Sequence, residues 1–376
     1  MKNRRHDRMR RAKSWAAIAA ALFIMAAGTG ALDVSPAAAG NSSPGTLLPV
    51  SKVKVTRAVP YTEVDGTTLT LDIYQPDDGR AGRPGIILIH GGAWTDGQAK
   101  DIADEAKLMA REGWVAFSVN YRLADDSTST WPEALSDVQR ATRWAGANAD
   151  TYGIDSQKLA ALGVSAGGHL AALLAEVGTA VDGSGKKLDD PNPPVTVKVV
   201  AAWSPPTELA GLVPPTDGGV PTDCVDDKAC GLFWRLPLVE NFLGCLPEQC
   251  PARYLEASPV SRVGPTTAPI WFANATNEIV GLPQAEALDE ALTAAKIEHH
   301  LEVVPGSQHA TGYKSKVWNT MMPWLATQLG VAEPPPVSFA ERNILLNPIV
   351  VIAVVIGLAL LIVLLAVALR DDEGEM

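Results

Sequence analysis

The chain has 376 residues, of which 47% are hydrophobic and 19% charged, and its formal net charge is −11 at pH 7. This length suffices for a sizeable buried core, whereas the acidic balance excludes a surface that attracts nucleic acid or anionic lipid. It gives no support to a polyanionic substrate either, and we interpret the negative charge as a contribution to solubility.

The first 39 residues have the pattern of a signal peptide. Seven Lys or Arg residues fall within the first 13 positions, an apolar run extends from Trp15 to Ala27, and Ala37-Ala38-Ala39 supplies small residues for cleavage. We therefore expect export, with cleavage before Gly40. An uncleaved N-terminal anchor is the alternative, and the pair Arg10-Arg11 leaves open whether the general or the twin-arginine route is used.

After the signal peptide, apolar runs alternate with helical patterns. A hairpin is expected first, with strands at 53–60 and 68–74 joined across Asp65-Gly66. Further strands are expected to begin near Ile86, Val115, Leu159, Val197, Ile270 and Leu301. Helical patterns cover residues 102–111, 132–149, 168–177, 284–295 and 314–328. This alternation predicts an α/β fold in which helices cover both faces of a mostly parallel sheet.

The strand near Ile86 runs into paired glycines, in the segment Gly85-Ile-Ile-Leu-Ile-His-Gly-Gly-Ala-Trp94. Glycines after a central strand let backbone amides approach a developing oxyanion without obstruction by side chains. The N–H groups of Gly91 and Gly92 are therefore the expected oxyanion donors. We expect His90 to hold this loop by hydrogen bonds rather than to transfer protons, and Trp94 to pack rather than to contact substrate.

An apolar run, Lys158-Leu-Ala-Ala-Leu162, leads into Gly163-Val-Ser-Ala-Gly167. A nucleophilic serine on a sharp turn between a strand and a helix needs minimal side chains two places to either side, and this motif has them. The motif predicts Ser165 as the nucleophile and the Ala166 amide as a third oxyanion donor. A glycine-rich helix start that carries an ordinary serine is the alternative for the motif alone.

Residues 205–263 are interpreted as an irregular cap insert over the active site, because they are rich in Pro, Gly and Asp and lack strand alternation. Four apolar side chains of the insert are expected mainly to pack its core, with an acyl or aryl pocket as the alternative. They are Phe233, Trp234, Leu236 and Phe242.

All four cysteines of the chain fall within this insert: Cys224, Cys230, Cys245 and Cys250. In an exported protein, cysteines at such spacings indicate disulfides. Of the three possible connectivities, we expect Cys224–Cys230 with Cys245–Cys250, since each pair closes a short loop. The spacings and the lack of a nearby histidine argue against zinc, and neither a metal nor an organic cofactor is expected.

A histidine follows the last expected strand, at the end of Leu301-Glu-Val-Val-Pro-Gly-Ser-Gln-His309. The other histidines fit a general base less well: His169 lies in the helix after the elbow, His299 and His300 begin a strand, and His6 precedes the cleavage site. The pattern therefore predicts His309 as the base that activates Ser165.

These motifs together resemble the α/β-hydrolase superfamily and, within it, esterases and lipases that carry an HGGxW loop. The resemblance covers about residues 61–328. Its motifs are His90-Gly-Gly-Ala-Trp94, Asn120-Tyr-Arg122, Asp137-Val-Gln-Arg-Ala-Thr-Arg-Trp144, Tyr152-Gly-Ile-Asp155, Gly163-Val-Ser-Ala-Gly-Gly-His169 and Pro305-Gly-Ser-Gln-His309. It implies ester hydrolysis through an acyl-enzyme. Similar proteins include carboxylesterases, feruloyl-esterase-like and acetyl-xylan-esterase-like proteins and kynurenine formamidases, and the fold alone does not choose among their substrates.

The expected acid position departs from the pattern of this family. Relatives place the acid after the strand that matches residues 268–273, in a Thr-Asp-Glu-like turn, whereas this chain reads Thr276-Asn277-Glu278. Asparagine can orient an imidazole but cannot supply the charge that stabilises imidazolium. Either Asn277 or the adjacent Glu278 is expected to orient His309, with Glu208 as a more distant candidate.

The C-terminal part of the chain is strongly apolar. From Ile349 to Leu369 it contains no charged residue, and as a helix this run would span roughly 31 Å, which matches a bilayer core of about 30 Å. We expect a hydrolase domain at 40–330, a proline-rich linker at 331–345, a transmembrane helix at 346–369 and a cytoplasmic tail at 370–376.

The sequence thus predicts an exported serine hydrolase of carboxylic esters, anchored in the plasma membrane by its C-terminal helix with the catalytic domain outside. The expected partners are an ester substrate and, through that helix, the lipid bilayer, and no nucleic acid is expected to bind. An amidase or peptidase on the same fold is one alternative. A catalytically weakened surface binding protein is another, because Asn277 occupies the expected acid position. The natural substrate and the oligomeric state stay open.

Overall fold

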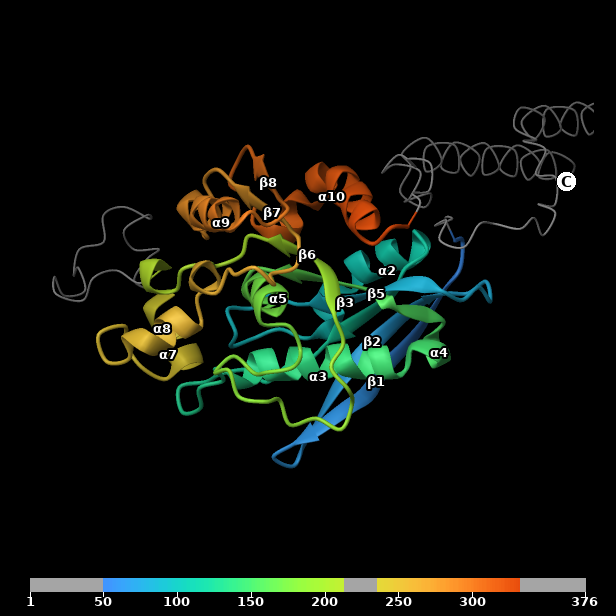
Figure 1. Ribbon diagram of the computed structural model, residues 1–376, viewed down its shortest axis with the longest axis horizontal. Helices are drawn as coiled ribbons and strands as arrows, with labels where there is room; N and C mark the ends of the chain where they lie inside the picture. Colours follow the sequence, from blue (N-terminus) through green and yellow to red (C-terminus); the bar gives the residue numbers. More distant parts are fainter. Residues whose placement is uncertain (1–49, 213–234, 332–376) are drawn as a thin grey trace, which may run out of the picture. The chain divides into compact units, whose positions relative to one another are not determined.

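The computed structural model describes residues 50–212 and 235–331, all of which belong to one unit of the chain, residues 44–376 (Figure 1). The predicted signal peptide at 1–39 lies outside the described residues. The predicted boundaries of the hydrolase domain, 40 and 330, stay predictions.

In the described residues, eight strands form one sheet in the order β1-β2-β4-β3-β5-β6-β7-β8. The strands are β1 (Val53–Val64), β2 (Thr67–Pro76), β3 (Arg83–Ile89), β4 (Val115–Val119), β5 (Ile154–Val164), β6 (Val197–Trp203), β7 (Ile270–Ala275) and β8 (His299–Val304). Only β1 with β2 and β2 with β4 pair antiparallel. The central β3 and β4 are buried along their whole length, as parallel strands covered on both faces are. The predicted mostly parallel sheet is confirmed.

The hairpin that opens the sheet is longer than the sequence predicts. Its turn is the predicted Asp65-Gly66, and both residues have the positive φ angles, 51° and 74°, that a two-residue type I′ turn requires. The strands continue beyond the predicted ends because irregularities in the register, between Thr56 and Val59 and between Pro60 and Thr62, let pairing resume.

Helices cover both faces of the sheet, as the alternating pattern predicts. Helices α3 (Glu133–Ala147), α5 (Ala166–Val177) and α9 (Leu282–Ala295) contribute buried side chains to the hydrophobic cluster on one face. Helices α2 (Ala103–Arg111) and α10 (Lys314–Gln328) contribute to the cluster on the other face (Figure 1). A short helix, α4 (Ala149–Tyr152), leads into β5.

The predicted fold class included a C-terminal transmembrane helix, and that part of the prediction was wrong. Among residues 50–212 and 235–331, no helix is both long and apolar enough to cross a membrane. The longest helices described, α3 and α10, have 15 residues each, which is about 22 Å against a hydrocarbon core of about 30 Å. The segment in which the span was predicted, 346–369, lies outside the described residues, as do the linker beyond residue 331 and the tail at 370–376.

The insert between β6 and β7 is more regular than the sequence suggests. Its described part contains α7 (Arg235–Leu243) and α8 (Pro251–Glu256), together with single 3₁₀ turns at Ala210–Leu212 and Pro259–Ser261. Proline, which the sequence analysis took as a sign of loops, here begins a helix: Pro251 occupies the first turn of α8, where its missing N–H costs nothing.

Within the insert, a disulfide joins Cys245 to Cys250, one of the two predicted pairs. Cys224 and Cys230 lie outside the described residues, as do Phe233, Trp234 and the side chain of Leu236. Phe242 is fully buried and stacks on Trp94, with ring centroids 4.7 Å apart, which confirms that it packs the core.

Candidate active site

Ser165 lies on a strained turn between β5 and α5. It caps the N-terminus of α5 with φ 55° and ψ −122°, a conformation that few residues other than glycine adopt. Glycine is required two positions before and two positions after Ser165. A Cβ on Gly163 would lie 1.9 Å from the Gly167 carbonyl oxygen, and a Cβ on Gly167 would lie 2.2 Å from the carbonyl oxygen of Ile89. This is the geometry of a nucleophile elbow, which exposes the serine at the end of a central strand.

His309 lies after β8, and its ring hydrogen-bonds Glu278. The Nδ1–H of His309 donates to Oε2 of Glu278, since a carboxylate can only accept. The Glu278 side chain is fully buried, whereas that of His309 is one-quarter exposed. His309 and Ser165 line the same cavity, which has a volume of about 440 Å³. The structure therefore brings together a nucleophile, an imidazole and a buried acid.

Among the described residues, neither of the other two candidates for the acid has a hydrogen bond to His309. The Asn277 side chain is exposed, and its amide donates to the Thr276 hydroxyl at 3.4 Å. Glu208 is exposed, and its backbone N–H donates to Oε1 of Gln284 at 2.7 Å. Although Asn277 occupies the position where the family pattern has the acid, the adjacent Glu278 is the residue that hydrogen-bonds His309.

One hydroxyl group that the sequence analysis did not single out, that of Ser204, holds the acid in place. Oε1 of Glu278 accepts from the Ala275 N–H at 2.6 Å and from the Ser204 hydroxyl at 2.9 Å. Ser204 Oγ in turn accepts from the Ala310 N–H at 2.9 Å and lies 2.8 Å from the Tyr313 hydroxyl. Ser204 therefore links the loop of the acid to the residue after His309.

Tyr313 completes this network as a neutral phenol. Its hydroxyl donates to the carbonyl oxygen of Ala273 at 2.8 Å, and burial raises its pKa well above the ordinary value.

The sequence offered one signal that could have identified Ser204 as a site residue, namely its position directly after β6. Residues at the carboxyl ends of parallel strands gather at one edge of a sheet.

The three predicted oxyanion donors lie around Ser165. Ala166 is the first residue of α5, where an N–H has no intrahelical acceptor. The backbone of Gly91 packs against the serine, since a Cβ there would lie 3.1 Å from the Cβ of Ser165. Gly92 has φ 113°, and a Cβ on it would collide with the Asp96 carbonyl oxygen at 1.9 Å. Within residues 50–212 and 235–331, neither the Gly91 nor the Gly92 N–H has an acceptor. Their role as donors stays a prediction.

His90 and Trp94 hold this loop, as expected. The His90 ring is buried, donates from Nδ1 to the carbonyl oxygen of Gly91 at 2.6 Å, and stacks on Tyr121 at 4.4 Å. Burial lowers the pKa of His90, which keeps it neutral. Trp94 is 2% exposed, and its Nε1–H donates to Nδ1 of His169 at 3.1 Å.

His169 connects three parts of the site. It is fully buried on α5, its Nδ1 accepts from Trp94 in the oxyanion loop, and its Nε2–H donates to the carbonyl oxygen of Ala257 in the insert at 2.7 Å. Acceptance at Nδ1 requires the neutral ring, and burial lowers the pKa of His169 to about 4. The sequence analysis set His169 aside as a base, and the structure gives it this linking position instead.

This burial predicts an acid sensitivity. The unfolded chain binds a proton at His169 below the ordinary pKa of 6.5, while the folded chain does so only near 4. The contribution of neutral His169 to the free energy of unfolding is therefore fully present above pH 6.5. This contribution decreases as the pH drops towards 4, by about 2 kcal/mol at pH 5. Urea unfolding at pH 7.5 and 5.0 should show that acidification costs the wild type about 2 kcal/mol more than it costs His169→Gln.

Substitution of an exposed histidine serves as the control for this comparison. His300→Gln should keep the pH dependence of the wild type, since the His300 side chain is 45% exposed. Equal pH dependence in wild type and His169→Gln would show that His169 does not titrate below its ordinary range.

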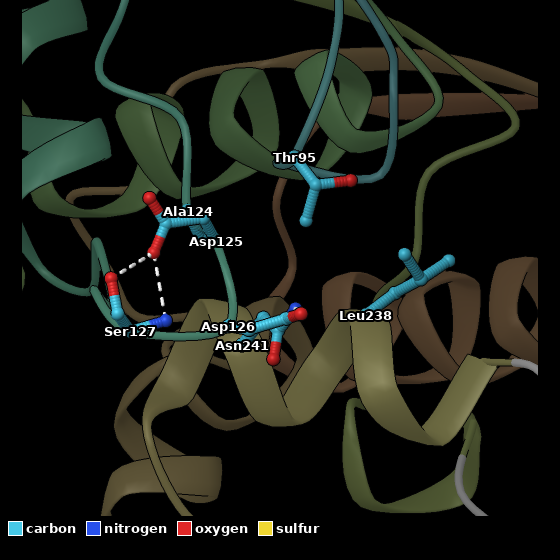
Figure 2. A pocket seen from close by; sticks show the side chains of 7 residues that line it. All are labelled: Thr95, Ala124, Asp125, Asp126, Ser127, Leu238 and Asn241. Carbon is cyan, nitrogen blue, oxygen red and sulfur yellow. Dashed lines mark hydrogen bonds between the residues drawn. The ribbon is translucent and has the colours of Figure 1, made fainter.

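A second cavity, of about 60 Å³, adjoins Ser165 on the side of the insert. A third cavity, of about 480 Å³, is lined by neither Ser165 nor His309 and is shown in Figure 2.

In the described part of the chain, no cluster of three or more His, Cys, Asp or Glu side chains is arranged to hold a metal ion.

Comparison with known proteins agrees with this geometry. The model of the BD-FAE family matches residues 71–292, more than half of the chain. The chain is 29% identical over 246 residues to the probable carboxylic ester hydrolase LipM of Mycobacterium tuberculosis, covering 64% of this chain and 52% of LipM. It is 31% identical over 177 residues to the carboxylesterase NlhH of the same species, covering 46% and 50%. The chain therefore spans about half the length of these relatives.

Solved structures share the fold. An esterase from Thermogutta terrifontis, Est2, has a TM-score of 0.53 and 24% identity, covering 70% of this chain and 84% of that one. An acetyl ester-xyloside bifunctional hydrolase from Caldicellulosiruptor lactoaceticus has a TM-score of 0.58 and 21% identity, covering 76% and 99%. With the family model matching more than half of its length, the chain belongs to the BD-FAE family.

Proposed function

We propose that the protein hydrolyses carboxylic esters through an acyl-enzyme on Ser165. The observation that carries this proposal is that His309, which is hydrogen-bonded to the buried Glu278 side chain, lines the same cavity as Ser165. The similarity to the probable carboxylic ester hydrolase LipM and to the carboxylesterase NlhH supports the reaction class.

The first half of the reaction forms the acyl-enzyme. His309 takes the proton of the Ser165 hydroxyl while the serine oxygen attacks the ester carbonyl. The carbonyl oxygen becomes an oxyanion, which the N–H groups of Gly91, Gly92 and Ala166 stabilise. The carboxylate of Glu278 stabilises the imidazolium. His309 then gives its proton to the departing alcohol oxygen as the carbon–oxygen bond breaks, and this leaves the acyl group on Ser165.

Water completes the cycle by the same steps. His309 takes a proton from water, the hydroxide oxygen attacks the acyl carbonyl, and Ser165 leaves with a proton returned by His309. The idea of a weakened binding protein rested on Asn277, and it loses its basis because Glu278 occupies the position beside His309.

Labelling with a fluorophosphonate probe tests this mechanism directly. We expect the full-length protein to react at Ser165, as shown by peptide mapping, and to release p-nitrophenol from p-nitrophenyl acetate. A protein that neither reacts with the probe nor cleaves the ester would contradict the proposed function.

We also propose that the hydrolase domain is exported. The basic N-terminus followed by an apolar run supports this, and so does the disulfide between Cys245 and Cys250, since disulfides persist in oxidising compartments. Non-reducing peptide mapping of protein from the native cell envelope should recover Cys245 joined to Cys250 and find no free thiol. Free thiols at all four cysteines would contradict export.

A further inference from the structure

Two cavities meet at Ser165, and His309 lines one of them but not the other. This difference shows which half of an ester belongs in which cavity. His309 lines the cavity of about 440 Å³ and does not line the cavity of about 60 Å³. The group that protonates the leaving alcohol must lie on the side of that alcohol. The alcohol half of the substrate therefore belongs in the larger cavity, and the acyl half belongs in the smaller one.

The smaller cavity is lined mainly by apolar side chains. Trp94 and Ala93 come from the oxyanion loop, Leu238 and Val239 from α7, and the others that line it with Ser165 are Ala166, Pro206, Leu212, Ile279 and Val280. For scale, a cavity of about 150 Å³ holds a benzene molecule, so about 60 Å³ accommodates roughly two carbon atoms. An acetyl or propionyl group fits this space, whereas a hexanoyl chain exceeds it.

Leu238 lies between this cavity and the third cavity. Among the described residues, Leu238 alone lines both the cavity of about 60 Å³ and the third cavity, of about 480 Å³. Figure 2 shows Leu238 and Asn241 on α7, with Thr95 opposite them on the loop that follows Trp94. Leu238 is only partly buried, while its neighbour Val239 is 1% exposed and belongs to the core. Shortening Leu238 therefore opens one cavity into the other without removing a core side chain.

We propose that Leu238 limits the acyl group to two or three carbon atoms, so that the protein is an esterase for short acyl chains. This inference rests on the proposed ester hydrolysis at Ser165. It assigns specificity to the insert, since α7 supplies the side chain that closes the acyl cavity.

A series of p-nitrophenyl esters from acetyl to octanoyl tests this inference with the full-length protein. In the wild type, kcat/KM for the hexanoyl ester should be at least about tenfold below that for the acetyl ester. Leu238→Ala should raise the ratio of hexanoyl to acetyl kcat/KM by at least about tenfold. Leu238→Val, a milder change, should move the ratio in the same direction by a smaller factor.

The matched control is Leu255→Ala on α8, because Leu255 is 60% exposed and lines none of the three cavities. It should leave the ratio unchanged. A wild type that cleaves hexanoyl and acetyl esters equally well, or a Leu238→Val variant with an unchanged ratio, would overturn the assignment of Leu238 while ester hydrolysis stood. No cleavage of any ester and no probe labelling would instead overturn the proposed function and this inference with it.

Discussion

Ser165→Ala should lower kcat for p-nitrophenyl acetate by about 10⁶-fold, because the substitution removes the hydroxyl that we propose attacks the ester carbonyl. The elbow accommodates alanine as well as serine, since the strained φ of 55° and the close approaches are properties of the backbone and of Gly163 and Gly167. Steady-state kinetics and a thermal melt measure the two effects separately.

His309→Ala should cost nearly as much as the serine substitution. The double variant should be no slower than either single one, because nucleophile and base act as a unit and their losses do not add. Ser184→Ala is the matched control, since Ser184 lies in an exposed turn held by Asp182. Hydrolysis by Ser165→Ala at a rate near that of wild type would refute the assignment of the nucleophile.

Glu278→Gln should lower kcat by about 10⁴-fold, the cost of replacing the acid of a serine triad by its amide. The amide cannot stabilise imidazolium, and its NH₂ group would face the Nδ1 or the Ser204 hydroxyl as a donor where an acceptor is needed. The effect should lie in kcat, with KM changed little, because Glu278 is fully buried and does not line the cavity.

Two further variants separate Glu278 from the other candidates for the acid. Asn277→Asp should change kcat by less than about threefold, since its exposed side chain points to Thr276 and solvent screens the added charge. Glu208→Gln makes the same chemical change as Glu278→Gln at a residue without contact to His309 among those described, and it should have no effect. If Glu208→Gln were the damaging variant, the acid would have been misassigned.

The sheet and the elbow could be predicted because both depend on short stretches of sequence. A buried strand such as β3 is an unbroken apolar run, and a serine flanked at two places by glycine meets a steric requirement that the neighbouring backbone sets. The order of the three motifs along the chain then made Ser165 and His309 a pair, although 144 positions separate them.

The acid could not be chosen from the sequence, because Asn277 and Glu278 are adjacent and only the direction of each side chain distinguishes them. The turn after β7 points Glu278 inward, where the Ala275 N–H and the Ser204 hydroxyl hold one carboxylate oxygen and leave the other for His309. Ser204 lies 74 positions from Glu278, so no local pattern could have shown that it supports the acid.

The amino-acid sequence by itself predicted the α/β class, Ser165 as nucleophile, His309 as base and the oxyanion loop, since each prediction depends on residues within one strand and the turn that follows it. Tertiary structure alone decided which residue orients His309, that His169 joins Trp94 to Ala257, and that Leu238 lies between two cavities. The physical reason is common to all three. Hydrogen-bond geometry and cavity volume depend on side chains from separate elements packed to within a few tenths of an ångström, and a linear pattern carries no such distances.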